Sequence, residues 1–195
     1  MKKLLNVGGG NKAIALPSLY AGYEQMLLDI DPAGKPDIVL DARQLATLDA
    51  GMFDAVYCSH NLEHYYRHDV QAVLGGFLHV LKPGGFAHVR VPDLEELMRA
   101  VVGNGLDVED VLYQSPAGPI TVLDVLYGYG AEIERSGQDF YAHKTGFTKA
   151  SLTKALDVAG FSPVYVRTGQ LEVNALAFKG APDPDLRALF NLPPQ

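Results

Sequence analysis

The chain has 195 residues, of which 48% are apolar and 20% charged, a composition typical of one soluble domain around a single core. Its 16 basic and 23 acidic residues give a net charge of −7, which disfavours a nucleic acid as partner because a polyphosphate backbone repels an acidic surface. No apolar run approaches the roughly 18 residues that span a bilayer, and no signal-peptide core is present. With Cys58 as the single cysteine, these features predict a cytoplasmic protein with no membrane partner.

Short apolar segments alternate with helical patterns in the first half of the chain, which is typical of a parallel sheet with crossover helices. Each segment is rich in Val, Ile, Leu and Phe and ends at a turn-forming residue. The predicted strands cover residues 3–7, 25–28, 37–40, 53–58 and 86–91. The fold class is therefore α/β.

The clearest helix is predicted between the fourth and fifth strands. Apolar side chains recur there at the spacing of one helical face, at Val70, Val73, Leu74, Phe77, Leu78 and Leu81. The segment Lys82-Pro83-Gly84-Gly85 ends this helix and turns the chain into the next strand. After the first strand, Pro17 interrupts any long helix, so we expect a loop and only a short helix around Ser18–Tyr23.

The C-terminal part predicts one more helix and a hairpin. Thr148 can cap a helix that Gly160 ends. Strands over residues 164–168 and 172–179 follow, and the tight turn at Gly169-Gln170 between them requires antiparallel pairing. We expect one domain over residues 1–180 and a Pro-rich tail over 181–195, whose helical turn docks on the body or on another subunit.

The first strand ends in Gly8-Gly9-Gly10, where the backbone can turn sharply and lie against a ligand. Asp29 ends the second strand, 19 residues after Gly10, and its carboxylate can accept both hydroxyls of a ribose. Together they favour an adenosine-containing ligand. The alternative is a glycine turn for strand packing, with Asp29 capping the Asp31-Pro32 turn. The spacing Gly8-x-Gly10-x-x-Ala13 also leaves an NAD-dependent oxidoreductase open.

Four segments in order resemble the motifs of class I S-adenosylmethionine-dependent methyltransferases. They are LNVGGG at 5–10, LDIDP at 28–32, FDAVYCSHNLEH at 53–64 and VLKPGG at 80–85. The resemblance covers residues 3–93 and 147–179. It implies a Rossmann-like, seven-stranded, mostly parallel sheet with an antiparallel last strand in a three-layer αβα sandwich, and S-adenosylmethionine as cofactor. The C-terminal hairpin agrees with this ending, which NAD-binding folds usually lack.

The resemblance also implies a set of cofactor-binding residues, namely Asn6, Gly8, Gly9, Gly10, Asp29, Ile30, Asp41, Ala42, Ser59 and His60. The glycines lie beside the methionine part, and Asp29 binds the ribose. Ile30 and Asp41-Ala42 border the adenine, and Ser59-His60 lie under the sulfonium. Asn6 departs from the family, which usually has Asp or Glu there. An amide keeps an acceptor but loses the charge that favours the cationic sulfonium, so weaker cofactor binding is expected.

Five of the six histidines lie between residues 60 and 88. His60, His64 and His68 recur every four residues, so on one continuous helix they would share a face and could bind a metal. We favour the interpretation in which their ring nitrogens cap local backbone, because His60 precedes the expected helix and His64 belongs to the LEH motif. No metal is therefore expected.

Residues 103–146 form an insert longer than a plain crossover needs, at the sheet edge where such loops usually determine specificity. It contains the polar-tipped or flat side chains of Tyr113, Tyr127, Tyr129, Phe140, Tyr141 and His143. Its apolar residues between Val111 and Leu126 could form two short helices in a lid or a homodimer face. His143 is the best candidate for a proton acceptor, and His60 is the second catalytic candidate.

The predicted function is methyl transfer to an unidentified acceptor, a small molecule or a sugar. No Pro-Pro-aromatic signature of amino-group methylation follows the fourth strand, so oxygen, nitrogen and carbon acceptors all stay open. A cofactor-binding module without catalytic activity is the remaining alternative, since Asn6 replaces the usual acid.

Overall fold

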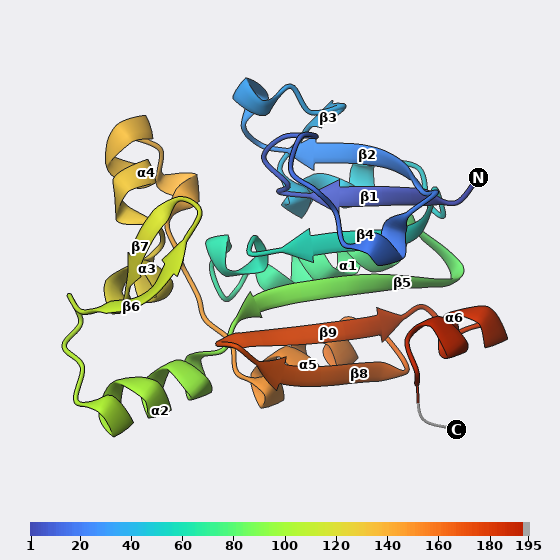
Figure 1. The fold of residues 1–195 in the computed structure, drawn as a ribbon. Helices are drawn as coiled ribbons and strands as arrows, with labels where there is room; N and C mark the ends of the chain where they lie inside the picture. The colour runs from blue at the N-terminus through green and yellow to red at the C-terminus, as the bar shows by residue number, and fades with distance from the viewer. Residues whose placement is uncertain (193–195) are drawn as a thin grey trace.

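The computed structural model describes residues 1–192 and is built on a seven-stranded sheet with strand order β3-β2-β1-β4-β5-β9-β8 (Figure 1). Its strands are β1 Lys3–Val7, β2 Glu24–Asp29, β3 Ile38–Val39, β4 Phe53–Ser59, β5 Leu81–Pro92, β8 Val164–Gly169 and β9 Glu172–Phe178. β9 pairs antiparallel with both β5 and β8, whereas β3, β2, β1, β4 and β5 pair in parallel. The predicted Rossmann-like fold with an antiparallel last strand is confirmed.

One face of the sheet carries the main core. Alternate side chains of β5 and β9, such as Val89 and Ala175, are fully buried on this face. The helices α1 Val70–Val80 and α5 Lys149–Val158 cover it, and they lie behind the sheet in Figure 1. Both helices match their predicted positions, and Thr148 caps α5 through its side chain.

The opposite face has a thinner cover. The crossover after β1 contains only the 3-10 turn η1 Ser18–Tyr20, as the position of Pro17 predicts. The other cover is α6 Pro184–Leu189, which packs Leu186 against a small cluster with Phe86 and Phe178. The C-terminal segment therefore docks on the body of the same chain as far as residue 192, and residues 193–195 of the predicted tail lie outside the described part.

The insert forms a separate small layer beyond the carboxyl ends of the parallel strands (Figure 1). The helix α2 Leu94–Asn104 leads into the insert, whose elements include β6 Val111–Ser115, β7 Gly118–Thr121, α3 Val122–Tyr127 and α4 Gly130–Ser136. The expectation of two helices was wrong for its first half, because Val111, Leu112 and Ile120 lie in a β-hairpin. Pro116 and Gly118 turn the chain there, and the short apolar segments pair with each other instead of coiling.

The remaining elements are short 3-10 turns at the strand ends, namely η2 Pro32–Gly34, η3 Ala42–Thr47, η4 Leu62–His64 and η5 Asp139–Tyr141. β5 begins earlier than predicted, at Leu81, because a register shift accommodates the turn at Gly84 within the strand. The β8–β9 turn also differs, since Gly169 pairs with Glu172 and the turn residues are Gln170 and Leu171. No helix within residues 1–192 is long and apolar enough to cross a membrane.

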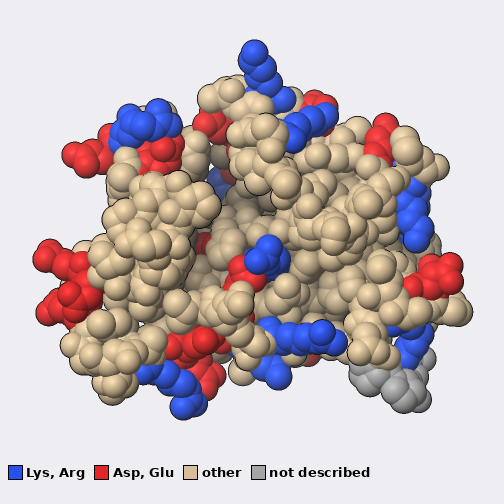
Figure 2. Space-filling model, in the orientation of Figure 1, with Lys and Arg blue, Asp and Glu red and all other residues tan. Residues whose placement is uncertain are grey.

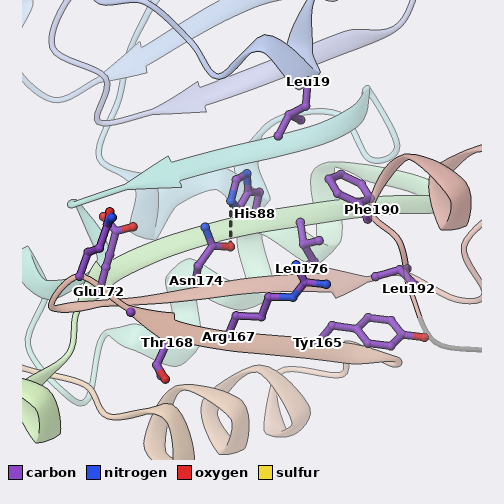
Figure 3. Close-up of a pocket in the computed structure, with 12 residues that line it drawn as sticks. Leu19, His88, Tyr165, Arg167, Thr168, Glu172, Asn174, Leu176, Phe190 and Leu192 are labelled. Carbon is purple, nitrogen blue, oxygen red and sulfur yellow. Dashed lines mark hydrogen bonds between the residues drawn. The ribbon is translucent and has the colours of Figure 1, made fainter.

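Polar side chains lie on the thinly covered face, where β5, β9 and β8 border a cavity of about 370 Å³. Figure 3 shows His88 of β5 directed at Asn174 of β9, with a hydrogen bond of 3.1 Å between Nε2 and Oδ1. The other ring nitrogen of His88 lies 3.0 Å from the hydroxyl of Tyr20. Burial and the nearby Arg90 lower the pKa of His88 to about 4. His88 is therefore neutral at physiological pH.

This burial predicts a pH-dependent loss of stability. In the unfolded chain His88 takes up a proton near pH 6.5, whereas in the folded chain it stays neutral until about pH 4. The free energy of unfolding should therefore fall as the pH drops from 6.5 to 4, by up to about 3 kcal/mol from this residue. Urea denaturation of the wild type and of His88→Gln between pH 6.5 and 4 measures how the free energy of unfolding of each protein changes with pH. Equal pH slopes for the two proteins would contradict the assignment.

Candidate active site

The loops after β1 and β2 are joined by the carboxylate of Asp29. Its Oδ2 accepts a hydrogen bond of 2.9 Å from the Gly10 amide, and its Oδ1 accepts one of 2.9 Å from the Asp31 amide. The amide of Gly8 donates to the carbonyl of Leu28 at 2.9 Å. Asp29 is buried, at 8% exposure. The structure thus brings the predicted glycine loop and the predicted ribose acid together, and Asp29 also makes the turn contact that was the alternative interpretation.

The loop needs glycine both for its backbone conformation and for its close neighbours. Gly8 and Gly10 both have a φ of 67°, in the left-handed region. A Cβ on Gly8 would collide with the side chain of Asn61, and a Cβ on Gly34 of η2 would collide with the carbonyl oxygen of Gly10. Asn6 lies buried in β1, where its amide packs against Gly9. These close neighbours therefore restrict where the backbone of the glycine loop can lie.

A first cavity of about 220 Å³ lies beside this loop, and we call it the η4 cavity. Ile30 and Asp41, which the resemblance places beside the adenine, both line it. Asn61 lines it as well, and its buried Oδ1 has no hydrogen-bond partner among the described residues. An unpartnered acceptor in this cavity fits a ligand that carries an N–H or O–H group.

The other residues that border the η4 cavity are Arg43 of η3 and side chains from the loop after β4 and from the insert. They include Tyr65, Tyr66, Phe140 and Lys144, which sequence reasoning did not assign to the cofactor. Asp41 is not free, because Arg43 donates to it from its amide and its guanidinium. Ala42 is buried at the start of η3, and Ser59 ends β4 half-buried. Neither of these two lines the cavity.

The end of the insert connects the loops after β2 and β4. The hydroxyl of Tyr141 donates to Asp31 at 2.9 Å. The amides of Lys144 and Thr145 donate to the carbonyl of Glu63 at 2.8 and 3.1 Å. The insert therefore lies against the open edge of the sheet beside the glycine loop, and Figure 2 shows the surface hollowed between the insert and the sheet.

A second cavity of about 340 Å³ lies between the insert and the β8–β9 turn, and we call it the insert cavity. His60 and His143, the two catalytic candidates, both line it. Its other walls include Tyr113, Ile120, Val125, Leu171 and Glu172. Sequence reasoning missed Leu171 and Glu172, because they come from a distant hairpin turn and no local motif marks them.

His60 carries a positive charge in this cavity. It has a left-handed φ of 49°, and its Nε2 lies 2.7 Å from Oε1 of Glu172. Burial acts against the charged ring, but the hydrogen bond to Glu172 and the nearby carboxylate of Glu63 outweigh burial and raise the pKa of His60 to about 9. Arg90 also binds Glu172 through two hydrogen bonds of 2.9 Å. A protonated His60 cannot act as a base at neutral pH.

His143 has the opposite character. Burial is the main effect and lowers its pKa, so that the ring is neutral at physiological pH. Its Nδ1 lies 2.9 Å from the carbonyl of Val125. Because a carbonyl only accepts, Nδ1 carries the proton and Nε2 keeps its lone pair. His143 can therefore accept a proton or bind a cation through Nε2.

Comparison with known proteins agrees with this arrangement of loops and cavities. The sequence model of the methyltransferase domain family matches residues 5–89, which contain the glycine loop, Asp29 and the loop after β4. The protein is similar to this family over that segment, and its solved structural neighbours include S-adenosylmethionine-dependent methyltransferases. S-adenosylmethionine is its cofactor. No match was found among curated protein sequences.

Solved structures share the fold of this methyltransferase. A methyltransferase from Archaeoglobus fulgidus aligns with a TM-score of 0.57 and 14% identity, over 91% of this chain and 86% of that one. A methyltransferase from Methanosarcina mazei aligns with a TM-score of 0.58 and 16% identity, over 91% of this chain and 92% of that one. The 1,6-didemethyltoxoflavin-N1-methyltransferase of Burkholderia thailandensis aligns with a TM-score of 0.54 and 17% identity, over 92% of this chain and 72% of that one. Its structure was solved with bound 1,6-didemethyltoxoflavin and S-adenosylhomocysteine. At these identities the likeness establishes the fold.

The packing of the glycine loop predicts the effect of one methyl group. In Gly34→Ala the added Cβ must displace the backbone of Gly10, so S-adenosylhomocysteine should bind at least about tenfold more weakly, a change of about 1.4 kcal/mol. Gly75→Ala in α1 is the matched control, because a Cβ there meets nothing within 4 Å. Calorimetry with S-adenosylhomocysteine measures both. Unchanged affinity in folded Gly34→Ala would show that the loop position does not matter for binding.

Proposed function

We propose that this methyltransferase methylates an oxygen or nitrogen atom of a small molecule, sugars included, that binds in the insert cavity. The observation that carries the proposal is that His60 and His143, which are 83 residues apart, line one cavity of about 340 Å³. That volume suits a metabolite-sized ligand. Adjacent residues of the loop after β4 serve both cavities, because His60 lines the insert cavity and Asn61 lines the η4 cavity.

We propose further that the cofactor binds along the glycine loop and in the η4 cavity. Asp29 would receive the ribose hydroxyls, since each of its oxygens makes one hydrogen bond and keeps acceptor capacity. Ile30 and Asp41 would border the adenine, and the unpartnered Oδ1 of Asn61 would accept from the cofactor. Gly8, Gly9, Gly10, Asn6, Ala42 and Ser59 would shape the floor of the site.

The chain would contribute mainly positioning. The cofactor supplies a methyl group that its sulfonium already activates. The protein would hold the acceptor atom in line with that methyl and keep water away. His143 could remove the proton of a hydroxyl acceptor through Nε2. The three linked charges of Glu172, His60 and Arg90 would fix the polar groups of the acceptor.

The walls of the insert cavity support a partly apolar acceptor. Ile120, Val125 and Leu171 provide apolar surface, and Tyr113 provides a flat ring with a hydroxyl. The toxoflavin-type methyltransferase with the same fold, which holds 1,6-didemethyltoxoflavin, is an example in which the acceptor is a small molecule. The contacts of Tyr141, Lys144 and Thr145 across the edge would let the insert act as a lid.

The cofactor assignment can be tested at Asp29. Asp29→Asn keeps the shape of the side chain but removes the charge, so S-adenosylhomocysteine should bind with about 1.5–3 kcal/mol less free energy, the range for a hydrogen bond to a charged group. Asp49→Asn, at an exposed aspartate, serves as the control and should bind normally. Calorimetry reports both affinities. Full affinity in Asp29→Asn would exclude the ribose role.

The acceptor assignment can be tested at two tyrosines of the insert. A panel of phenols, heteroaromatic amines and sugars is screened by release of S-adenosylhomocysteine. With any acceptor found, Tyr113→Ala should raise its KM at least about tenfold because a cavity wall is lost, without changing affinity for S-adenosylhomocysteine. Tyr127→Ala is the matched control, since this tyrosine is 64% exposed and does not line the cavity. Equal KM values for both variants would place the acceptor elsewhere.

A further inference from the structure

Three potential metal ligands meet where the insert contacts the loop after β4. A carboxylate oxygen of Glu63 and one ring nitrogen each of His64 and His143 all lie within 4.8 Å of one another. Glu63 and His64 are neighbours in η4, whereas His143 comes from the insert, 79 residues further along. Folding therefore assembles this group of ligands, which no sequence spacing shows.

Glu63 gives an independent indication of a bound cation. Its side chain is 1% exposed, and neither carboxylate oxygen has a hydrogen-bond partner among the described residues. The nearest positive charge is the protonated ring of His60, whose Nδ1 lies 3.5 Å from Oε1 without a hydrogen bond to it. A buried carboxylate without donors is strongly unfavourable, and a charged neighbour that makes no hydrogen bond compensates it only in part. A cation between Glu63 and the rings of His64 and His143 would give the carboxylate a direct partner.

Both histidines are oriented as metal ligands usually are. Nδ1 of His64 lies 3.1 Å from the carbonyl oxygen of Ala142, and Nδ1 of His143 lies 2.9 Å from that of Val125. Each Nδ1 must donate, so in the neutral form of each ring it is Nε2 that carries the lone pair. A backbone carbonyl that holds the other ring nitrogen is the common support of a metal-binding histidine. The two rings are in contact, with centroids 4.9 Å apart.

We propose that Glu63, His64 and His143 bind one divalent first-row transition-metal ion. Two imidazole nitrogens and one carboxylate oxygen suit ions such as Zn²⁺, Mn²⁺, Fe²⁺ or Co²⁺. Ligands around one such ion stand roughly 3–3.5 Å apart, given bonds of about 2.0–2.2 Å, so the three side chains move together on binding. Three protein ligands leave further coordination positions open.

The site lies in the partition between the two cavities. His64 lines the η4 cavity, and His143 lines the insert cavity. An ion there would face the space that we assign to the acceptor. It could then bind an oxygen atom of the acceptor, and this role in acceptor binding rests on the proposed function. It would also occupy Nε2 of His143, so that residue cannot be both a metal ligand and the base. Metal binding therefore decides which role His143 has.

Cobalt titration of the full chain, first stripped of metals with a chelator, tests the site. We expect one equivalent of Co²⁺ to bind, with visible absorption bands that Zn²⁺ removes by competition. Glu63→Gln and His143→Ala should each weaken binding at least about tenfold, because each removes a ligand. His68→Ala is the matched control. His68 is also near the loop after β4, but its side chain is 79% exposed and it is not part of the group.

The result is read together with folding and cofactor binding. No saturable Co²⁺ binding, or equal binding by the wild type and His143→Ala, would overturn the metal site and leave His143 available as the base. If Glu63→Gln does not fold, His143→Ala decides, because this residue is in the insert and outside the main core. S-adenosylhomocysteine affinity is measured on the same samples. If S-adenosylhomocysteine does not bind, the proposed cofactor site is contradicted, whereas the cobalt result is unaffected.

Discussion

The parallel pairing of β1 between β2 and β4 is the constraint on which the site depends. Val7 pairs with Leu28 on one side and with Cys58 on the other, so all three strands end at the same level. The glycine loop, Asp29 and the His60–Glu63 segment must then begin side by side. The ladder hydrogen bonds satisfy the buried backbone groups of β1 on both sides, which makes this arrangement hard to change by local substitutions.

The insert forms part of the walls of both cavities at this edge of the sheet. Two of its contacts are backbone hydrogen bonds, from Lys144 and Thr145 to the carbonyl of Glu63, and these two do not depend on particular side chains. Side chains in the same region are therefore free to differ for specificity. The end of the insert thus positions Tyr141 against the loop after β2 and His143 against the loop after β4.

Charge is distributed unevenly around the two cavities. The charged side chains of His60 and Glu172 line the insert cavity, and Glu172 also binds Arg90. The partition holds the carboxylate of Glu63, which has no hydrogen-bond partner among the described residues, beside neutral His143. Asn6 removes the acidic group that related methyltransferases usually place at the end of β1. Glu63 is a buried carboxylate at the same edge of the sheet, in the loop after the neighbouring strand β4. Negative charge is therefore still present at this edge, although in a different loop.

Local patterns in the sequence predicted most elements of the main sheet and its helices. Apolar periodicity predicted α1, the position of Thr148 predicted α5, and Pro17 predicted the short η1 turn. The glycine loop and Asp29 were found because both lie next to strand ends. Each of these signals concerns residues that are close together in the chain, where spacing alone fixes the local geometry.

Tertiary structure alone decided which distant side chains meet. His60 contacts Glu172 across 112 positions, and His143 joins Glu63 and His64 only because the insert folds back over the β4 loop. The β6–β7 hairpin was missed for a related reason, since its short apolar segments fit a helix or a strand equally well. The path of a long insert depends on packing against the rest of the chain, and no local spacing encodes that packing.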